Sequence, residues 1–205
     1  RGLAEIVGSD RVRTREPMSR HTSFRIGGPA EIFVEPTVRQ ITQVIACCRE
    51  REVPYTVIGN GSNLLVGDGG IPGVVISLGE RTSGISIFRE ELFAEAGALL
   101  SKVAANAQKA GLTGLEFAAG IPGSVGGAIV MNAGAYGGEM ADVLREVQVL
   151  TANGDIEIWD REKMDLGYRR SRVMREQAIV LSAFIDLKRG EPEQIRKRME
   201  ELAAK

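Results

Sequence analysis

The sequence predicts an α+β fold in two lobes: a small βαβ-like lobe, then a lobe built on a largely antiparallel sheet with helices. Residues 1–80 combine a helical apolar pattern with short apolar runs, whereas period-two alternation and a hairpin signal dominate the remainder. Glycine is about 12% of the 205 residues, against a typical share of roughly 7%. Seven glycines lie between Gly59 and Gly79 and nine between Gly111 and Gly138, which predicts two loops of special backbone.

The first lobe, residues 1–80, is organised around a predicted helix over residues 37–52. Thr37 and Gln40 form a capping-box pattern that marks its start. The residues with the spacing of one buried helix face are Val38, Ile41, Val44, Ile45 and Cys48. Short strands are predicted at residues 54–58 and 74–77, with the first glycine loop between them.

The second lobe, residues 81–190, is predicted to be mainly strands, with its boundary near Gly79 to Gly84. Ile85 alternates with Ile87, and Leu92 with Ala94 and Ala96, as half-buried strands do. A helix over residues 99–110 is expected to end at Gly111, which can adopt the left-handed conformation.

A hairpin and a long strand complete this lobe. Val147 and Val149 precede Asn153-Gly154, and Ile156 and Ile158 follow it, an arrangement typical of a β-hairpin. Residues 178–187 predict a long strand. The spacing of Ile195, Met199 and Leu202 predicts an amphipathic helix over residues 191–205.

Composition excludes several function classes. The 26 basic and 27 acidic residues give a net charge of -1, which argues against a nucleic-acid or anionic-membrane partner. Cys47 and Cys48 are adjacent and His21 is the single histidine, so we expect no disulfide framework, no metal site and a reducing cytoplasm. Residues 117–138 lack charge but contain seven glycines, which favours a loop beside a short helix over a membrane span. No signal-peptide pattern follows Arg1.

The two glycine loops have the composition of anion-binding backbone, because glycine lets successive N–H groups turn toward one oxygen cluster. Gly59–Asn63 follows a predicted strand and adds side-chain donors. Neither a Walker-type lysine nor the G-x-G-x-x-G spacing is present, so an NTPase or Rossmann site is disfavoured. In Gly120–Gly127, a short helix starting at Ser124 would offer free N–H groups to a phosphate. The pair suits a diphosphate-bearing cofactor; the alternative for either loop is a tight structural turn.

Four segments together resemble the UDP-N-acetylenolpyruvoylglucosamine reductase family. Residues 57–66 are similar to its diphosphate-binding segment, and residues 22–30 to its opening motif. Residues 114–127, continuing into 132–137, resemble its central motif, and Tyr168–Ser171 its Tyr-Arg-x-Ser motif. The four occur in the family's order and span most of the chain.

The resemblance implies a two-lobed FAD-binding fold of the vanillyl-alcohol oxidase type, with FAD held non-covalently between the lobes. It implies that NADPH reduces FAD and that the flavin passes hydride to the enolpyruvyl group of a UDP-sugar, giving UDP-N-acetylmuramate for peptidoglycan. The matching cofactor-binding positions are Gly59, Asn60, Gly61, Ser62, Asn63, Leu64, Gly120, Ile121, Pro122, Gly123, Ser124, Gly126, Gly127, Asn132, Ala133 and Gly134.

Arg169 matches the family's catalytic arginine, which would stabilise charge developing beside the substrate carboxylate. The alternative is a solvated basic face, because Arg170, Arg172 and Arg175 lie in the same segment. The resemblance assigns His21 no covalent link to the flavin, and we expect a structural role for it.

The family's proton-donating serine and late glutamate belong to a third, substrate-binding domain, and neither motif occurs in this sequence. We therefore expect the flavin-binding portion of the reductase, with the helix at residues 191–205 leading to an absent domain and with activity in doubt for this chain alone. An oxidase of the same flavin fold and a non-catalytic FAD-binding fragment are the alternatives. The sequence does not predict an oligomeric state.

Overall fold

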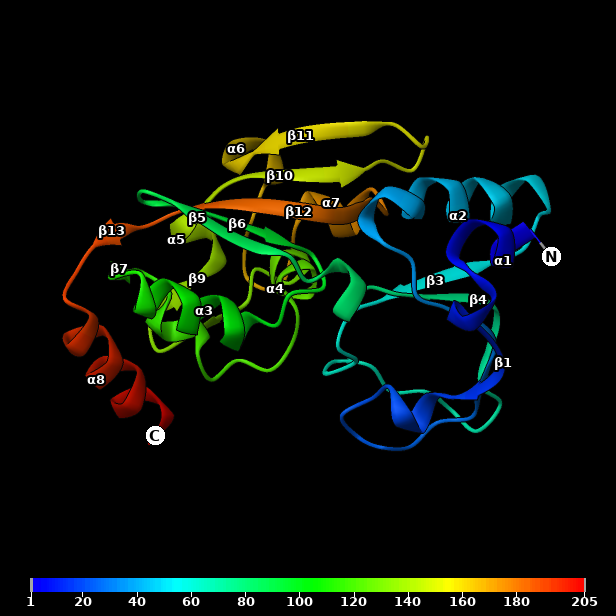
Figure 1. The fold of residues 1–205 in the computed structure, drawn as a ribbon, viewed down its shortest axis with the longest axis horizontal. Helices are drawn as coiled ribbons and strands as arrows, with labels where there is room; N and C mark the ends of the chain where they lie inside the picture. The colour runs from blue at the N-terminus through cyan, green and yellow to red at the C-terminus, as the bar shows by residue number, and fades with distance from the viewer. Residues whose placement is uncertain (1, 205) are drawn as a thin grey trace. The chain divides into compact units, whose positions relative to one another are not determined.

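The computed structural model describes residues 2–204, which form two compact units (Figure 1). The first unit ends at Thr82 and the second begins at Ser83. The helices and strands of the first unit are α1 (Gly2–Val7), β1 (Val12–Pro17), β2 (Pro29–Val34), α2 (Val38–Glu50), β3 (Tyr55–Ile58) and β4 (Ile71–Ser77).

The first unit is a four-stranded sheet in the order β1-β2-β4-β3. β4 pairs in parallel with both β2 and β3, so α2 makes the crossover of a βαβ unit, as predicted. β1 adds an antiparallel edge that the sequence patterns did not predict. The α2 cap is present, because the backbone N–H of Thr37 donates to Oε1 of Gln40 at 2.9 Å. Four of the five residues expected on its buried face are buried, and Val38 is half-buried.

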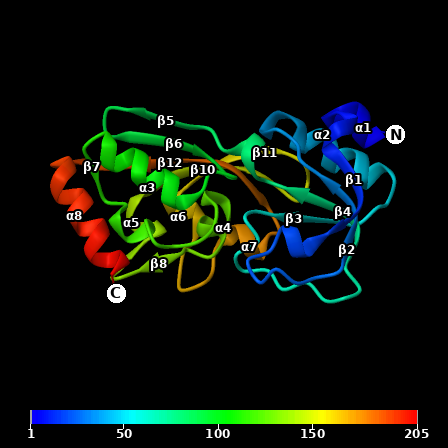
Figure 2. The same ribbon diagram turned by 60° about the horizontal axis from the view of Figure 1, so that its bottom comes forward.

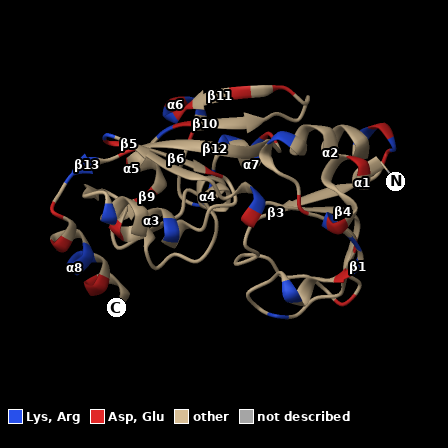
Figure 3. Cartoon of the chain, viewed as in Figure 1, with Lys and Arg blue, Asp and Glu red and all other residues tan. Residues whose placement is uncertain are grey.

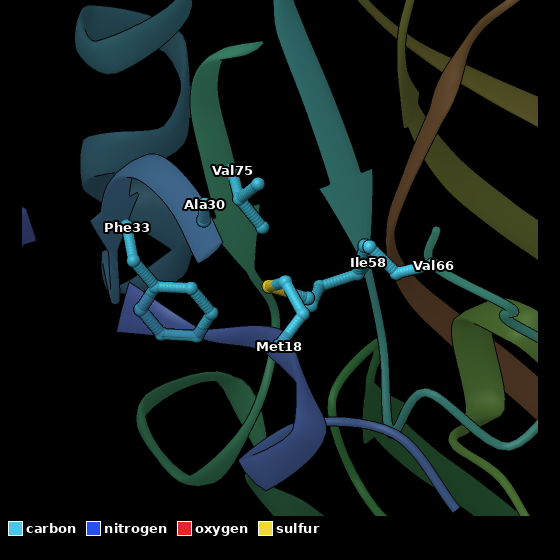
Figure 4. Close-up of a cluster of buried hydrophobic side chains, with 6 residues drawn as sticks. All are labelled: Met18, Ala30, Phe33, Ile58, Val66 and Val75. Carbon is cyan, nitrogen blue, oxygen red and sulfur yellow. The ribbon is translucent and has the colours of Figure 1, made fainter. Parts of the chain in front are cut away.

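A hydrophobic cluster in this unit holds the first glycine loop at both of its ends. Ile58 precedes the loop and Val66 follows it, and both are buried in the cluster (Figure 4). Leu64 packs against the same cluster from its edge. The remaining buried members are Met18, Ala30, Phe33 and Val75. Burial on either side of residues 59–63 therefore restricts this loop.

The second unit is built on a five-stranded sheet in the order β11-β10-β12-β6-β5, and every pairing is antiparallel, as predicted. Its strands are β5 (Ile85–Phe88), β6 (Glu91–Glu95), β10 (Leu144–Leu150), β11 (Ile156–Asp160) and β12 (Ile179–Asp186). The predicted hairpin is β10–β11, and Gly154 has a φ of +97° in its connection. Ile156 and Ile158 are exposed, so their alternation marked a strand but not a buried face.

Six helices and two small strand pairs surround this sheet in the described part of the second unit. The helices are α3 (Leu100–Lys109), α4 (Val125–Val130), α5 (Met140–Val143), α6 (Arg161–Met164), α7 (Arg172–Arg175) and α8 (Pro192–Ala203). The pairs are β7 (Leu112–Thr113) with β13 (Lys188–Arg189), and β8 (Gly134–Ala135) with β9 (Gly138–Glu139). Figure 2 shows α3, α4 and α5 on the same side of the sheet.

Two predicted helix features are confirmed in this unit. Gly111 follows α3 with a φ of +67°, the left-handed conformation expected of it. α8 buries Ile195 and Leu202 and packs against α3, and a basic stretch lies between two acidic ones along it (Figure 3).

Residues 117–138 form short turns, α4 and the β8–β9 pair, in agreement with the loop predicted for them. Within residues 2–204, no helix combines the length and the apolar character that crossing a bilayer requires.

Candidate functional site

The first glycine loop, residues 59–63, follows the carboxyl end of β3 and rests on the segment at residues 21–23. The N–H of Ser23 donates to the carbonyl of Gly61 at 3.1 Å. Gly61 has a φ of +65°, and a Cβ on it would lie 1.9 Å from the carbonyl oxygen of His21. The structure therefore gives Gly61 a reason to be glycine within the chain itself.

The opening motif at residues 22–30 also lies against the backbone that follows the first glycine loop. Gly28 donates its N–H to the carbonyl of Gly67 at 2.9 Å, and a Cβ on Gly28 would lie 2.0 Å from the carbonyl oxygen of Asp68. A Cβ on Gly70 would likewise lie 1.9 Å from the carbonyl oxygen of Pro29. The backbone of the motif thus packs directly against the backbone of residues 67–70. The pair Gly27-Gly28 in the sequence indicates such a close approach, because glycine has no Cβ.

His21 is held by contacts inside the first unit, as a structural residue would be. Its Nε2 lies 2.9 Å from Oε1 of Glu16, and its ring stacks on Phe33 with the centroids 4.1 Å apart.

Two asparagines of the first loop leave their polar groups open to the outside of the chain. Asn60 and Asn63 are both exposed. Within residues 2–204, neither their backbone N–H groups nor their carboxamides make a hydrogen bond. Ser62 between them is half-buried. The loop therefore has open donors on either side of Ser62.

The second glycine loop leads into α4 as predicted, with Ser124 as the N-cap. The N–H groups of the first turn of α4, expected to be free, are however bonded within the chain. Val125 and Gly126 donate to the carbonyls of Ala98 and Ala96, both at 2.8 Å. The next two N–H groups of the helix are bonded to the Ser124 hydroxyl oxygen at 3.5 Å and to its carbonyl at 2.9 Å.

The open donors lie just before the helix. Within the described residues, the N–H groups of Gly120, Gly123 and Ser124 have no acceptor. A Cβ on Gly120 would meet no atom within 4 Å, whereas one on Gly126 would lie 3.0 Å from Cβ of Ala96. Gly120 thus leaves space outside the chain, and Gly126 is glycine because α4 packs closely on the residue after β6.

Residues 132–134, predicted to bind the cofactor, are tied into the protein. Asn132 is buried, and both ends of its carboxamide are hydrogen-bonded within the second unit. Ala133 donates its N–H to the carbonyl of Ala128 at 2.7 Å. A Cβ on Gly134 would lie 2.7 Å from the carbonyl oxygen of Gly138, so the small β8–β9 pair requires this glycine.

Arg169 lies at the tip of a tight turn. Gly167 and Arg170 exchange two backbone hydrogen bonds of 3.1 Å, and Tyr168 and Arg169 lie between them. Tyr168 is 86% exposed, and Cζ of Arg169 lies 5.5 Å from the centroid of its ring. Arg169 has a φ of +51°, which is unusual for a residue other than glycine.

The other arginines of this segment are paired with carboxylates. Arg175 lies 2.5 Å from Asp165 and lowers the pKa of that carboxyl, to which Arg170 contributes at 3.8 Å. Arg172 pairs with Glu176 at 2.7 Å. In residues 2–204, no carboxylate lies within ion-pair distance of Arg169. Arg169 thus differs from its neighbours in having no carboxylate partner, and as an exposed residue it remains compatible with the solvated basic face as well as with a catalytic role.

Ser171, the last residue of the Tyr-Arg-x-Ser motif, is fully buried. Its hydroxyl donates to the carbonyl of Val130 at 2.8 Å and accepts from the N–H of Met174 at 3.3 Å, which caps α7. Within this motif, the exposed Arg169 therefore lies two residues before the buried and hydrogen-bonded Ser171. No group of three or more metal-ligating side chains occurs in residues 2–204.

Comparison with known proteins gives consistent matches. A family model described as an FAD binding domain matches residues 30–159. Two curated relatives are named UDP-N-acetylenolpyruvoylglucosamine reductase. The protein of Syntrophomonas wolfei is 46% identical over a match that covers 98% of this chain and 68% of the relative. The protein of Agathobacter rectalis is 50% identical over a match that covers 93% of this chain and 64% of the relative. The chain therefore spans about two thirds of the length of these curated relatives.

Solved structures agree. The UDP-N-acetylenolpyruvylglucosamine reductase of Thermus caldophilus is 38% identical with a TM-score of 0.79, covering 95% of this chain and 68% of that one. A variant of Phl p 4 described as a glucose oxidase is 14% identical with a TM-score of 0.67, covering 93% of this chain and 44% of that one. The second likeness shows the fold alone, the two-lobed FAD-binding fold of the vanillyl-alcohol oxidase type.

Proposed function

The chain belongs to the UDP-N-acetylenolpyruvoylglucosamine reductase family, and from this premise we propose that it is the flavin-binding part of an NADPH-dependent reductase. In this proposal it binds FAD non-covalently. The enzyme reduces UDP-N-acetylglucosamine enolpyruvate to UDP-N-acetylmuramate, a precursor of peptidoglycan. The match to an FAD binding domain over residues 30–159 supports the cofactor.

Each glycine loop, taken by itself, has open donors that suit a phosphate group of FAD. Backbone N–H groups that turn toward one oxygen cluster stabilise a phosphate without needing a lysine. In the first loop we assign this role to the N–H groups of Asn60 and Asn63, and in the second loop to those of Gly120, Gly123 and Ser124, none of which has an acceptor in the described residues. Gly120 adds open space where a diphosphate oxygen could approach the backbone.

Arg169 is the observation that carries the catalytic part of the proposal. Bound FAD would supply hydride to the enolpyruvyl alkene. The attack leaves negative charge on the carbon beside the carboxylate, and a proton delivered to that carbon completes the reduction. A guanidinium without a carboxylate partner can stabilise this charge, since it keeps its full positive charge and its planar fork of donors.

The backbone at Arg169 is held by its surroundings. Eight other non-glycine residues in the described chain also have a positive φ, so this conformation marks a turn and does not by itself indicate catalysis. The turn at Gly167–Arg170 and the buried Ser171 provide that surrounding structure.

Cofactor binding can be tested on this chain directly. We expect FAD titrated at micromolar concentration to bind, to show flavin absorbance that follows the protein, and to be released intact on denaturation. A well-folded chain that gives no binding signal contradicts the cofactor assignment.

The catalytic role requires a protein of the relatives' full length that carries this sequence. There, Arg169→Ala should leave the reduction of flavin by NADPH intact and slow its reoxidation by the enolpyruvyl substrate by about 10²- to 10³-fold. Arg170→Ala is the matched control, because it removes the same charge and breaks only an exposed ion pair with Asp165. Arg169→Lys should recover part of the rate, since it keeps the charge but loses the fork. Equal reoxidation rates in the parent and Arg169→Ala proteins would overturn the assignment.

A further inference from the structure

The carboxamide of Asn132 joins three segments of the second unit. Its Nδ2 donates to the carbonyl of Gly167 at 3.3 Å, and its Oδ1 accepts from the N–H of Ala141 at 2.9 Å. Asn132 lies just after α4, Ala141 lies in α5, and Gly167 begins the Arg169 turn. Asn132 is 5% exposed and has a φ of +43°, a conformation that asparagine tolerates better than most residues.

The Arg169 turn is bonded to the end of α4 on both of its sides. Before the tip, Gly167 is held by Asn132; after it, Ser171 is held by the carbonyl of Val130. Between these anchors, in residues 2–204, the turn has its own two backbone hydrogen bonds, the exposed ion pair of Arg170 with Asp165 and the contact of Arg169 with the Tyr168 ring. The end of α4 therefore determines where the backbone of Arg169 lies.

We propose that Asn132 is a positioning residue for Arg169, acting through the carbonyl of Gly167. The inference rests on the proposed function, because it concerns the delivery of the Arg169 guanidinium to substrate. A left-handed conformation is unfavourable for arginine, so contacts outside the turn help to maintain this backbone. A charge group stabilises a transition state only if its geometry is set beforehand. The role concerns the carboxamide of Asn132, which is bonded within the second unit.

The first test measures the turn itself, in this chain, by amide hydrogen exchange. Asn132→Gly removes the carboxamide while keeping a residue that suits φ near +43°. The amides of Gly167 and Arg170 should then exchange on the order of tenfold faster, as expected for the loss of one supporting hydrogen bond.

Two further variants make the result specific. Asn132→Asp keeps an acceptor for the N–H of Ala141 and loses the donor to Gly167, so exchange should accelerate in the turn while Ala141 stays protected. Asp142→Ala is the control, because it removes the 2.9 Å bond from the N–H of Glu139 at the start of α5 without touching the turn. Turn amides that exchange at the parent rate in both Asn132 variants overturn the proposal.

The second test uses the full-length holoenzyme and separates positioning from general damage. Asn132→Gly should slow reoxidation by the enolpyruvyl substrate by on the order of tenfold, and by a larger factor than it slows flavin reduction by NADPH. Added to Arg169→Ala, it should slow reoxidation no further, because Asn132 acts through Arg169. Losses that multiply in the double variant contradict the proposal. If Arg169→Ala alone has no effect, the proposed function has failed, and hydrogen exchange still decides whether Asn132 holds the turn.

Discussion

Alanine substitutions at Gly61 and Gly120 are expected to have opposite consequences, although both glycines lie in candidate diphosphate loops. A Cβ on Gly61 would lie 1.9 Å from the carbonyl oxygen of His21, so the loop or residues 21–23 must move. A Cβ on Gly120 would meet nothing within 4 Å. Gly61→Ala should therefore damage folding, and Gly120→Ala should damage FAD binding.

The magnitudes follow from these contacts. At Gly61, a φ of +65° disfavours alanine by roughly 1–2 kcal/mol, and relieving the overlap adds about 1–3 kcal/mol. A loss of about 2–5 kcal/mol lowers the melting temperature by roughly 4–20 °C in a chain of this size. Gly120 is not among the glycines at positive φ, so Gly120→Ala should change the free energy of unfolding by less than about 1 kcal/mol.

FAD affinity should move the other way. A methyl group at Gly120 would occupy space assigned to the diphosphate and displace one charge-assisted hydrogen bond of about 1.5–3 kcal/mol, which raises Kd by at least about tenfold. Thermal unfolding without FAD and fluorescence titration with FAD measure the two quantities. Parent-like stability of Gly61→Ala would refute the packing argument, and parent-like FAD affinity of Gly120→Ala would return that loop to a structural turn.

Two further predictions concern stability. The indole N–H of Trp159 donates to Oε2 of Glu157 at 2.6 Å, and this hydrogen bond is the main cause that lowers the pKa of Glu157. Its contribution to folding stability is therefore fully present above the ordinary pKa of a glutamate carboxyl. That contribution is lost as the pH falls through the lowered pKa of the folded protein. Acid titration followed by fluorescence of this single tryptophan should show that loss, and the same step in Glu157→Gln would contradict the assignment. Ser171→Ala removes the hydrogen bonds to Val130 and Met174 from a fully buried site, so it should lower the free energy of unfolding by about 1–3 kcal/mol. Thermal unfolding measures this change. A change below about 0.5 kcal/mol would contradict the role of the Ser171 hydroxyl in holding the turn.

The sequence by itself determined the elements whose burial follows a regular period. α2, α3 and α8 each bury one helical face, and β6 and β12 lie where alternating or continuous apolar residues predicted them. These patterns are local, because each element must turn one face to a core whatever packs against it. The resemblance to the reductase family also needed only the order of its motifs, and the comparisons confirm it.

Only the tertiary structure decided what each glycine and each polar motif residue does. A glycine in the sequence does not reveal whether an atom of the chain would exclude a Cβ at that position. At Gly61 the excluding atom belongs to His21, far away in sequence, whereas at Gly120 no protein atom is near. At the start of α4, the N–H groups of Val125 and Gly126, predicted to be free, donate to the carbonyls of Ala98 and Ala96. Such contacts depend on which distant segments the fold brings together, so the local spacing of apolar residues cannot predict them.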